Sequence, residues 1–182
     1  METISRTIRH DEVLGLEAFC LQGYAQPFPR HFHDYYVLGF VVSGEQELLC
    51  NGLSLQVFPG NLLIFNPPDN HECVSTSRAP FLHYLGFNIL KKRMEEISME
   101  LTGESCLPQF KLTVFSDESA CNAFLELHKL IIQRSDELRK EELFYLLFSR
   151  LFGKYAHTSL QSRPLRSSQI KEACEYLESH AS

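Results

Sequence analysis

The sequence predicts a mainly β fold, a small barrel or sandwich, that is followed by C-terminal α-helices. Residues 1–90 contain short apolar and β-branched runs separated by Gly, Pro and Asn, a texture typical of antiparallel sheets with tight turns. From residue 90 onward, Leu, Lys, Glu, Met and Arg recur in a composition that favours helices. This change in residue composition along the chain therefore predicts strands first and helices second.

The first part of the chain has several strand and turn signals. The run 35–42 (YYVLGFVV) is aromatic and β-branched, as expected of a strand. Asn51-Gly52 lies between two apolar runs, 45–50 and 53–58. Asn-Gly is the strongest short hairpin signal because both residues tolerate positive φ. Further strands are expected at 13–21, 62–65, 82–89 and 110–115.

Three helices are expected after the strands. The first covers residues 90–101. Ser116 is expected to cap the second, whose first turn begins with the acidic Asp117, a favourable charge near the N-terminal end of the dipole. A similar signal at 135–137 starts the third helix, which is expected to run to about Tyr155.

The third helix is rich in Leu and Phe over more than one stripe of its surface. A helix that is apolar around most of its circumference must be covered on more than one side. A small barrel covers one side, and a second copy of the chain is an economical cover for the other. We therefore predict a homodimer with Leu143, Leu147 and Leu151 in its interface; the alternative is that these residues pack inside the chain.

The end of the chain suggests a second domain. Residues 158–168 (TSLQSRPLRSS) are polar with one proline and predict a linker. In residues 169–182, Ile170, Ala173 and Leu177 fall on one face of a short amphipathic helix. That face has no evident partner before the chain ends. We interpret residues 169–182 as the start of a truncated domain.

Composition excludes several classes of protein. The net charge is −6 with no basic block, which argues against DNA binding by these residues themselves. The six cysteines are irregularly spaced without a C-x-x-C pair, as expected for reduced thiols. No signal peptide and no apolar stretch of about 20 residues is visible. The sequence therefore predicts a cytoplasmic protein without a membrane partner.

The run 28–36 (FPRHFHDYY), Gly44, the run 59–62 (PGNL) and the run 66–71 (NPPDNH) resemble the N-terminal domain of the AraC-family transcription regulators. Residues 170–180 are similar to the first helix of that family's DNA-binding domain. The resemblance covers nearly the whole chain. It implies a cupin-like double-stranded β-helix, or jelly-roll, barrel at 1–90, two to three helices forming a dimerisation segment at 91–157, a linker at 158–168 and the start of a helix-turn-helix domain at 169–182.

The resemblance also implies a function. In that family the barrel binds a small effector, the helices dimerise, and C-terminal helix-turn-helix domains read DNA. We therefore expect a ligand-sensing and dimerisation domain rather than an enzyme, with a small-molecule effector as partner. Effector binding would alter the presentation of the helix-turn-helix domains through an N-terminal arm at residues 2–9. DNA would be contacted only through the missing C-terminal domain.

A histidine cluster is the best candidate for an effector pocket. Side chains in an extended segment alternate between two sides, so His31, His33 and Tyr35 share one side. His71, which follows a Pro-Pro turn, could meet them across the barrel mouth. Arg30 could clamp a carboxylate; its alternative is an ordinary surface position. Aromatic walls could come from Tyr35, Tyr36, Phe65, Tyr84 and Phe87. The pocket candidates are Arg30, His31, His33, Tyr35, His71 and Phe87.

Three converging histidines would also suit a Zn, Ni, Fe or Mn ion with an open position. Metal-binding cupins typically add a Glu a few residues after the second His, and Val37 and Leu38 stand there in this sequence. We therefore expect no cofactor and no catalytic residue. The alternative is a metal-dependent cupin enzyme that uses His31, His33 and His71. A third possibility is a constitutive dimer scaffold with a collapsed barrel.

Overall fold

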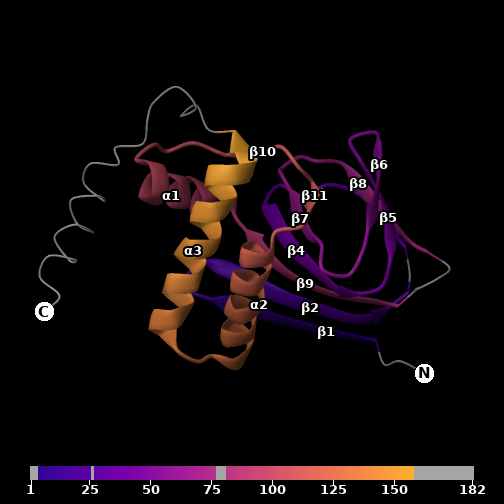
Figure 1. Cartoon of the computed structure of the whole chain (residues 1–182), viewed down its shortest axis with the longest axis horizontal. Coiled ribbons are helices and arrows are strands. Elements are labelled where there is room, and N and C mark those ends of the chain that lie inside the picture. The colour runs from indigo at the N-terminus through magenta and orange to yellow at the C-terminus, as the bar shows by residue number, and fades with distance from the viewer. Residues whose placement is uncertain (1–3, 26, 77–80, 158–182) are drawn as a thin grey trace, which may run out of the picture.

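A computed structural model describes residues 4–25, 27–76 and 81–157. Two antiparallel β-sheets face each other, and three helices cover the outer face of the larger sheet (Figure 1). This arrangement is the predicted cupin-like double-stranded β-helix followed by α-helices. None of the described helices is long and apolar enough to cross a membrane.

The two sheets are built from strands that are distant in sequence. In spatial order the six-stranded sheet contains β1 (Ser5–Asp11), β2 (Leu16–Tyr24), β9 (Leu82–Ile89), β4 (Tyr36–Ser43), β7 (Leu62–Phe65) and β11 (Val114–Phe115). The four-stranded sheet contains β3 (Phe28–His31), β8 (His71–Ser75), β5 (Gln46–Cys50) and β6 (Leu53–Val57). A separate pair joins β10 (Gln109–Phe110) to β12 (Ala156–His157). The helices are α1 (Lys91–Thr102), α2 (Glu118–Gln133) and α3 (Glu137–Tyr155).

The predicted Asn-Gly hairpin is confirmed. Asn51 and Gly52 both have positive φ, 51° and 84°, and connect β5 to β6 with Cys50 opposite Leu53. A two-residue loop with both φ values positive matches the right-handed twist of the flanking strands. The turn therefore fixes which side chains of β5 face the interior.

The central strands of the six-stranded sheet are buried on both faces. In β4, Val37 and Val41 belong to the core between the two sheets, whereas Tyr36, Leu38 and Phe40 belong to the core beneath the helices. Because side chains alternate along a strand, one strand supplies both cores. The continuous apolar run that predicted this strand reflects that double burial.

The strands of the barrel extend beyond the expected boundary at residue 90. The short strand β11 pairs with β7, with Val114 opposite Leu63, and so adds a strand after the first helix. Residues 5–9, which were expected in a separate arm, lie in β1 and pair with β2. The predicted linker at 158–168 and the predicted helix at 169–182 lie outside the described residues.

The assignment of Leu143, Leu147 and Leu151 to a dimer interface is corrected by the structure. All three are buried within a single chain, in the core beneath the helices. The buried positions of α3 recur every three or four residues and form one stripe: Lys140, Leu143, Phe144, Leu147, Phe148, Leu151, Phe152 and Tyr155. The sheet, α1 and α2 cover this stripe, so the alternative of packing inside the chain holds.

The helix starts follow the sequence signals to within one residue. The side chain of Asp117, rather than Ser116, caps α2 by accepting a hydrogen bond from the backbone N–H of Ala120 at 3.1 Å. Ser116 instead accepts a hydrogen bond from the Asn61 side chain. Asp136 caps α3 through the Arg139 N–H, and that helix ends at Tyr155 as predicted.

The buried carboxylate of Asp117 also joins the two long helices. It accepts hydrogen bonds from Arg150 and Lys154, at 2.5 and 2.9 Å, and from the Tyr155 hydroxyl at 2.9 Å. Burial alone would raise the pKa of Asp117, but these donors and the Ala120 N–H outweigh burial and hold it well below its usual value. The start of α2 is thereby fixed against the last turns of α3.

Candidate ligand-binding cavity

A cavity of about 270 Å³ lies between the two sheets. Most of its wall is apolar, which is typical of small-molecule sites. The apolar lining is Phe19, Leu21, Phe28, Val37, Val41, Val57, Leu63, Phe65 and Leu82. The lining residues with a polar group are Arg6, Tyr24, His31, His33, Tyr35, Gln46, His71, Cys73, Tyr84 and Asn88.

Two glycines make room for the rings that wall the cavity. Gly39 and Gly86 lie opposite each other in the pairing of β4 with β9. A Cβ on Gly39 would lie 1.7 Å from the Tyr84 hydroxyl oxygen, and one on Gly86 would lie 2.1 Å from the Phe19 ring. Neither distance is compatible with a side chain, so the glycine pair lets these two rings lie flat against the larger sheet.

The structure brings His31, His33 and His71 together. One nitrogen or another of each ring lies within 4.8 Å of the others, and His31 is opposite His71 in the pairing of β3 with β8. The ring of Phe65 stacks on His71 at a centroid distance of 3.9 Å. The expected juxtaposition across the barrel mouth is therefore present.

Backbone carbonyls orient two of these histidines. His31 Nδ1 lies 2.6 Å from the Pro29 carbonyl oxygen, and His71 Nδ1 lies 3.0 Å from that of Asp69. A carbonyl can only accept, so each Nδ1 donates and each Nε2 keeps its lone pair in the neutral ring.

The environment of His33 and His71 favours neutral imidazoles. Burial, helped by the neighbouring His71 and His31, lowers the pKa of His33 to about 4. Burial also lowers the pKa of His71. Both rings are therefore uncharged near neutral pH. They can accept hydrogen bonds, but they do not supply positive charge for an anion.

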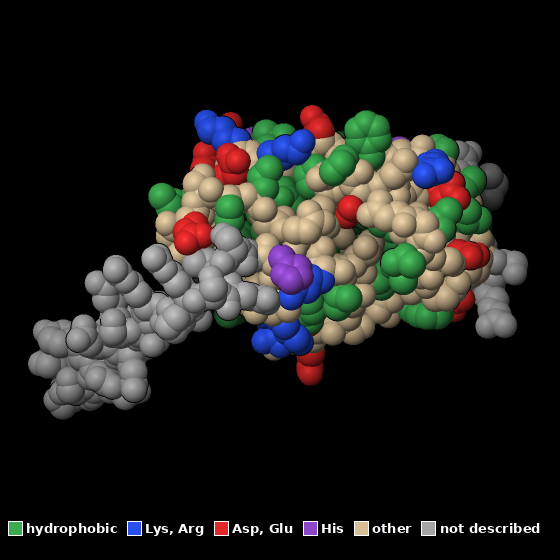
Figure 2. Space-filling model, turned by 90° about the horizontal axis from the view of Figure 1, so that it is seen from above, with side chains coloured by type: hydrophobic (Ala, Val, Ile, Leu, Met, Phe, Trp, Pro, Cys, Tyr) green, Lys and Arg blue, Asp and Glu red, His purple; other side chains and the backbone are tan. Residues whose placement is uncertain are grey.

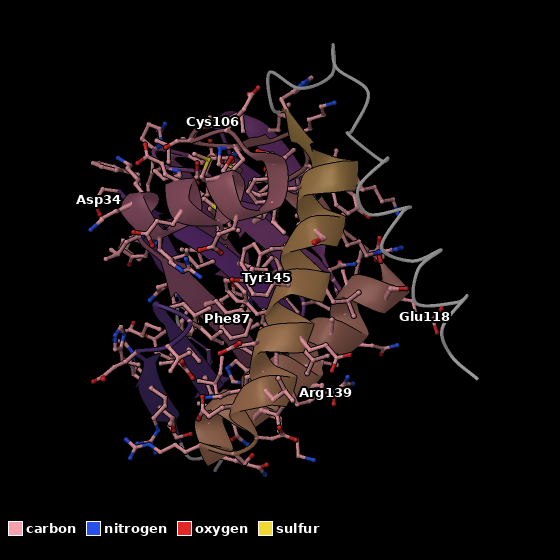
Figure 3. The ribbon with its side chains drawn as sticks, turned by 90° about the vertical axis from the view of Figure 1, so that its left-hand side faces the viewer. Asp34, Phe87, Cys106, Glu118, Arg139 and Tyr145 are labelled. Atoms are coloured by element: carbon pink, nitrogen blue, oxygen red, sulfur yellow. The ribbon has the colours of Figure 1, made fainter. Side chains whose placement is uncertain are left out.

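The other predicted pocket residues separate into two groups. Tyr35 lines the cavity, with its ring 4.8 Å from that of His33. Arg30 is exposed and donates to Asn70 Oδ1 at 3.2 Å, so it takes the surface alternative. Phe87 is fully buried on the opposite face of the sheet, where it contacts Phe124 beneath the helices (Figure 3). Arg30 and Phe87 are therefore not pocket residues.

The alternation of side chains along each strand explains which of the predicted aromatic residues line the cavity. Tyr84, Gly86 and Asn88 of β9 face the cavity side, which turns Phe87 toward the helices. Tyr36 likewise faces the helices, where its hydroxyl donates to the Pro108 carbonyl. Of the five aromatic residues expected in the wall, Tyr35, Phe65 and Tyr84 line the cavity.

Gln46 is a cavity residue that sequence reasoning missed. It is 3% exposed and lines the cavity at the start of β5. The alternation Gln46, Leu48, Cys50 ahead of the Asn-Gly turn was the available signal, because it places Gln46 on the same side as two buried apolar residues. Arg6, on the edge strand β1, and Asn88 were missed as well.

The histidine cluster fits a metal ion only in part. Four-coordinate Zn with Zn–N bonds of about 2.0–2.1 Å brings its nitrogen ligands to roughly 3.3 Å from one another, closer than the 4.8 Å span found here. Among the described residues, no Asp or Glu joins the three histidines. The two positions where a Glu was sought hold Val37, which faces the cavity, and Leu38, which faces the helices. Neither side chain can ligate a metal ion.

The two facing sheets, with an apolar cavity between them, define a cupin-type binding domain. The family model for the AraC-like ligand binding domain matches residues 15–148. The chain therefore belongs to the AraC-like ligand binding domain family.

Individual relatives were found by sequence and by structure. The chain is 39% identical over 181 residues to the uncharacterized HTH-type transcriptional regulator YbfI of Bacillus subtilis (strain 168). The match covers 99% of this chain and 66% of that relative, so the chain spans just under two thirds of the relative's length.

Two solved structures show partial similarity. KdgF from Halomonas sp. is 24% identical, with a TM-score of 0.40 over 47% of this chain and 79% of that one. An RmlC-like cupin from Methanocaldococcus jannaschii is 11% identical, with a TM-score of 0.41 over 50% of this chain and 81% of that one.

The glycine pair makes a prediction about stability. Gly39→Ala should lower the free energy of unfolding by about 1–3 kcal/mol, because the new methyl group displaces the Tyr84 ring. Gly153→Ala is the matched control on α3: a Cβ there meets nothing within 4 Å, so the change should stabilise by about 0.5–1 kcal/mol through helix propensity. Urea unfolding measures both. Equal effects of the two substitutions would contradict the packing role of Gly39.

Proposed function

We propose that this chain is the effector-sensing and dimerisation part of a bacterial AraC-type transcription regulator, and not an enzyme. A small molecule binds between the two sheets, and its binding changes how C-terminal helix-turn-helix domains are presented to DNA. The observation that carries the proposal is the apolar cavity with a few polar side chains at defined positions. The family membership and the regulator relative support the same role.

One connection between the cavity and the helices runs through β2. The Phe19 ring lines the cavity, and the Phe19 carbonyl oxygen lies 2.9 Å from Nε2 of His128 on α2. A shift of β2 on ligand binding would thus reach α2 directly. Such a switch requires the ligand to bind one arrangement more tightly. About 5 kcal/mol of difference moves a protein from mostly off to mostly on.

DNA contact is assigned to the C-terminal helix-turn-helix domain rather than to the barrel. The net charge of the chain is −6, and phosphate binding depends on clustered Lys and Arg. On the face shown in Figure 2, the Lys and Arg side chains are interspersed with Asp and Glu. The sensing domain would therefore act on DNA only by positioning the domains attached to it.

The proposed homodimer would use the outer surface of α3. Leu138 and Leu146 are 80% and 56% exposed, on the side of the helix away from the buried stripe. Tyr145 lies on this outward side (Figure 3), and its hydroxyl donates to Glu100 of α1. A second copy of the chain would cover these leucines in a self-complementary interface.

A metal-dependent enzyme is the second candidate, and the convergence of three histidines favours it. His31, His33 and His71 would hold the ion through ring nitrogens. A bound Zn, Ni, Fe or Mn ion would polarise a substrate or activate a water molecule. The neutral state of His33 and His71 near pH 7 suits ligation, since a metal ligand must be deprotonated. The missing carboxylate places this candidate second.

Filling the cavity tests effector binding. We expect at least one compound from a panel of sugars, organic acids and aromatics to raise the melting temperature, since a ligand at 100 times its Kd stabilises by about 2.7 kcal/mol. Val41→Phe, which places a ring in the cavity, should abolish that rise. Val42→Phe is the control, because Val42 is exposed and does not line the cavity. A panel without any effect would favour the constitutive scaffold, and a rise that survives Val41→Phe would place the ligand elsewhere.

Metal content separates the sensor from the enzyme. We expect protein purified without a histidine tag to hold well below one metal ion per chain by plasma mass spectrometry. His31→Ala and His71→Ala should leave that content unchanged, as should the control His10→Ala, which alters an exposed histidine of β1. A stoichiometric ion that is lost in the first two variants and kept in the third would overturn the sensor reading in favour of the enzyme.

The oligomeric state tests the surface of α3. We expect sedimentation of the parent chain to show a dimer at micromolar concentration and Leu146→Glu to shift it to a monomer, because a buried charge opposes association. Leu53→Glu is the control, since Leu53 is 67% exposed in the β5–β6 hairpin. A monomeric parent would refute dimerisation by this segment. A dimer that persists in Leu146→Glu would move the interface away from α3.

A further inference from the structure

The described residues end in β12, which continues directly from α3 and pairs with β10 in a sheet of two strands (Figure 1). The predicted linker at 158–168 follows this strand in the sequence. Under the proposed function, a shift of β10 and β12 would therefore move the point at which the DNA-binding domain is attached. What holds this pair of strands in place then matters for regulation.

The strand β10 is held along both of its edges. On the β12 side, the N–H of Lys111 donates to the Tyr155 carbonyl oxygen at 3.0 Å. On the other side, the Phe110 N–H donates to Asn66 Oδ1 at 2.8 Å, and Asn66 Nδ2 donates to the Phe110 carbonyl oxygen at 3.1 Å. Pairing of both backbone groups of one residue is what a neighbouring antiparallel strand provides. The side-chain amide of Asn66 thus takes the place of a third strand.

Asn66 belongs to the 66–71 turn, which connects β7 to β8. Within this turn, Asp69 Oδ2 accepts hydrogen bonds from the Asn66 backbone N–H at 2.8 Å and from Asn66 Nδ2 at 3.0 Å. The Asp69 N–H donates to the Asn66 carbonyl oxygen at 2.7 Å, and Asp69 Oδ1 accepts from Asn51 at 2.8 Å. Both Asn66 and Asp69 are buried. A buried network with its partners in place is rigid, so the turn can move as one unit.

His71 connects this turn to the cavity. Its ring lines the cavity, and its Nδ1 lies 3.0 Å from the carbonyl oxygen of Asp69. Direct hydrogen bonds therefore link a cavity residue to Asp69, Asp69 to Asn66, and Asn66 to β10. His33 also lines the cavity, but among the described residues it makes no hydrogen bond to the 66–71 turn.

We propose that Asn66 is the positioning residue that couples the cavity to β12. A molecule that displaces the His71 ring shifts the 66–71 turn, and the Asn66 amide passes this shift to β10 and so to the strand that precedes the linker. This inference rests on the proposed function of the cavity as an effector site. It differs from the connection through β2 and His128, which ends at α2.

Amide hydrogen exchange of the whole chain, measured by NMR, tests the coupling without an effector, because exchange reports local opening of a hydrogen bond. His71→Phe should keep a ring on Phe65 while removing the bond to Asp69. We expect the Lys111 N–H to exchange about threefold to tenfold faster in this variant, the range that corresponds to about one hydrogen bond. The matched control His33→Phe should change the rate by less than about twofold, and amides of β9 should report any global unfolding.

Double variants distinguish coupling from simple support. Asn66→Ala should itself speed the exchange of Lys111, and His71→Phe added to it should have little further effect, because the link is already broken. Tyr36→Phe is the comparison. Its hydroxyl donates to the Pro108 carbonyl oxygen just before β10, from the helix side of β4. This bond supports β10 independently of the cavity, so the effects of Tyr36→Phe and His71→Phe should multiply.

Two results would overturn the inference. One is an unchanged exchange rate of Lys111 in His71→Phe, and the other is an equal effect of His71→Phe with and without Asn66. If Asn66→Ala does not fold, the comparison of His71→Phe with His33→Phe decides: faster exchange in the first alone supports the route through the turn, and a rise in both or in neither refutes it. The effector site itself is decided separately by the Val41→Phe comparison.

Discussion

The structure depends on the central strands of one sheet being buried on both of their faces. The helices cover one face of the six-stranded sheet, and the other face forms a wall of the barrel. Every interior residue of β4, β7 and β9 therefore has an assigned side, and a shift of register by one residue would exchange the two sets. Gly39 and Gly86 belong to this constraint, because only positions without a Cβ leave space for the Tyr84 and Phe19 rings.

Double burial also makes the sheet a mechanical link. Phe19 contributes its ring to the cavity and its carbonyl to His128 of α2. At the edge of the sheet, β1 carries Arg6 at the cavity and Asp11 at its other end, where the buried Lys140 of α3 binds the Asp11 carboxylate. Removing Lys140 would leave the buried Asp11 carboxylate without its counter-charge, whereas removing Asp11 would leave Lys140 its ion pair with Glu137 at 2.8 Å. The cavity wall and the two long helices are thus joined at both β1 and β2.

The sequence predicted the order of elements well because local signals dominate them. Asn51-Gly52 formed the expected hairpin, and the acidic residues near positions 117 and 136 capped helices. Failures arose where tertiary packing decides. The Leu and Phe residues of α3 suggested an excess of apolar surface, but the sheet, α1 and α2 bury Leu143, Leu147 and Leu151 in one chain. The pairing of β11 with β7 is long-range, and no local signal marks it.

In the site, too, local signals predicted some positions, and tertiary packing decided the others. His31, His33 and Tyr35 do line one cavity with His71, but not as one extended segment: β3 ends at His31, and the chain bends at 34–35 before β4 begins at Tyr36. Phe87 failed because an aromatic residue in a doubly buried strand gives no sign of which core it joins; only the register of β9 with β4 decides. Gln46 was overlooked because a single glutamine is common on surfaces, and its burial depends on the facing strand β8.

The absence of a carboxylate beside the histidines shapes what the cavity can do. With Val37 and Leu38 at the positions where a Glu was sought, His33 and His71 offer neutral ring nitrogens, and Gln46 and Tyr84 add an amide and a hydroxyl to the lining. Hydrogen-bonding groups set in an apolar wall can orient a small molecule, and a bound metal ion would add the power to polarise a substrate. The described lining residues thus supply what the proposed effector site needs, and the metal content decides whether they also serve the second candidate.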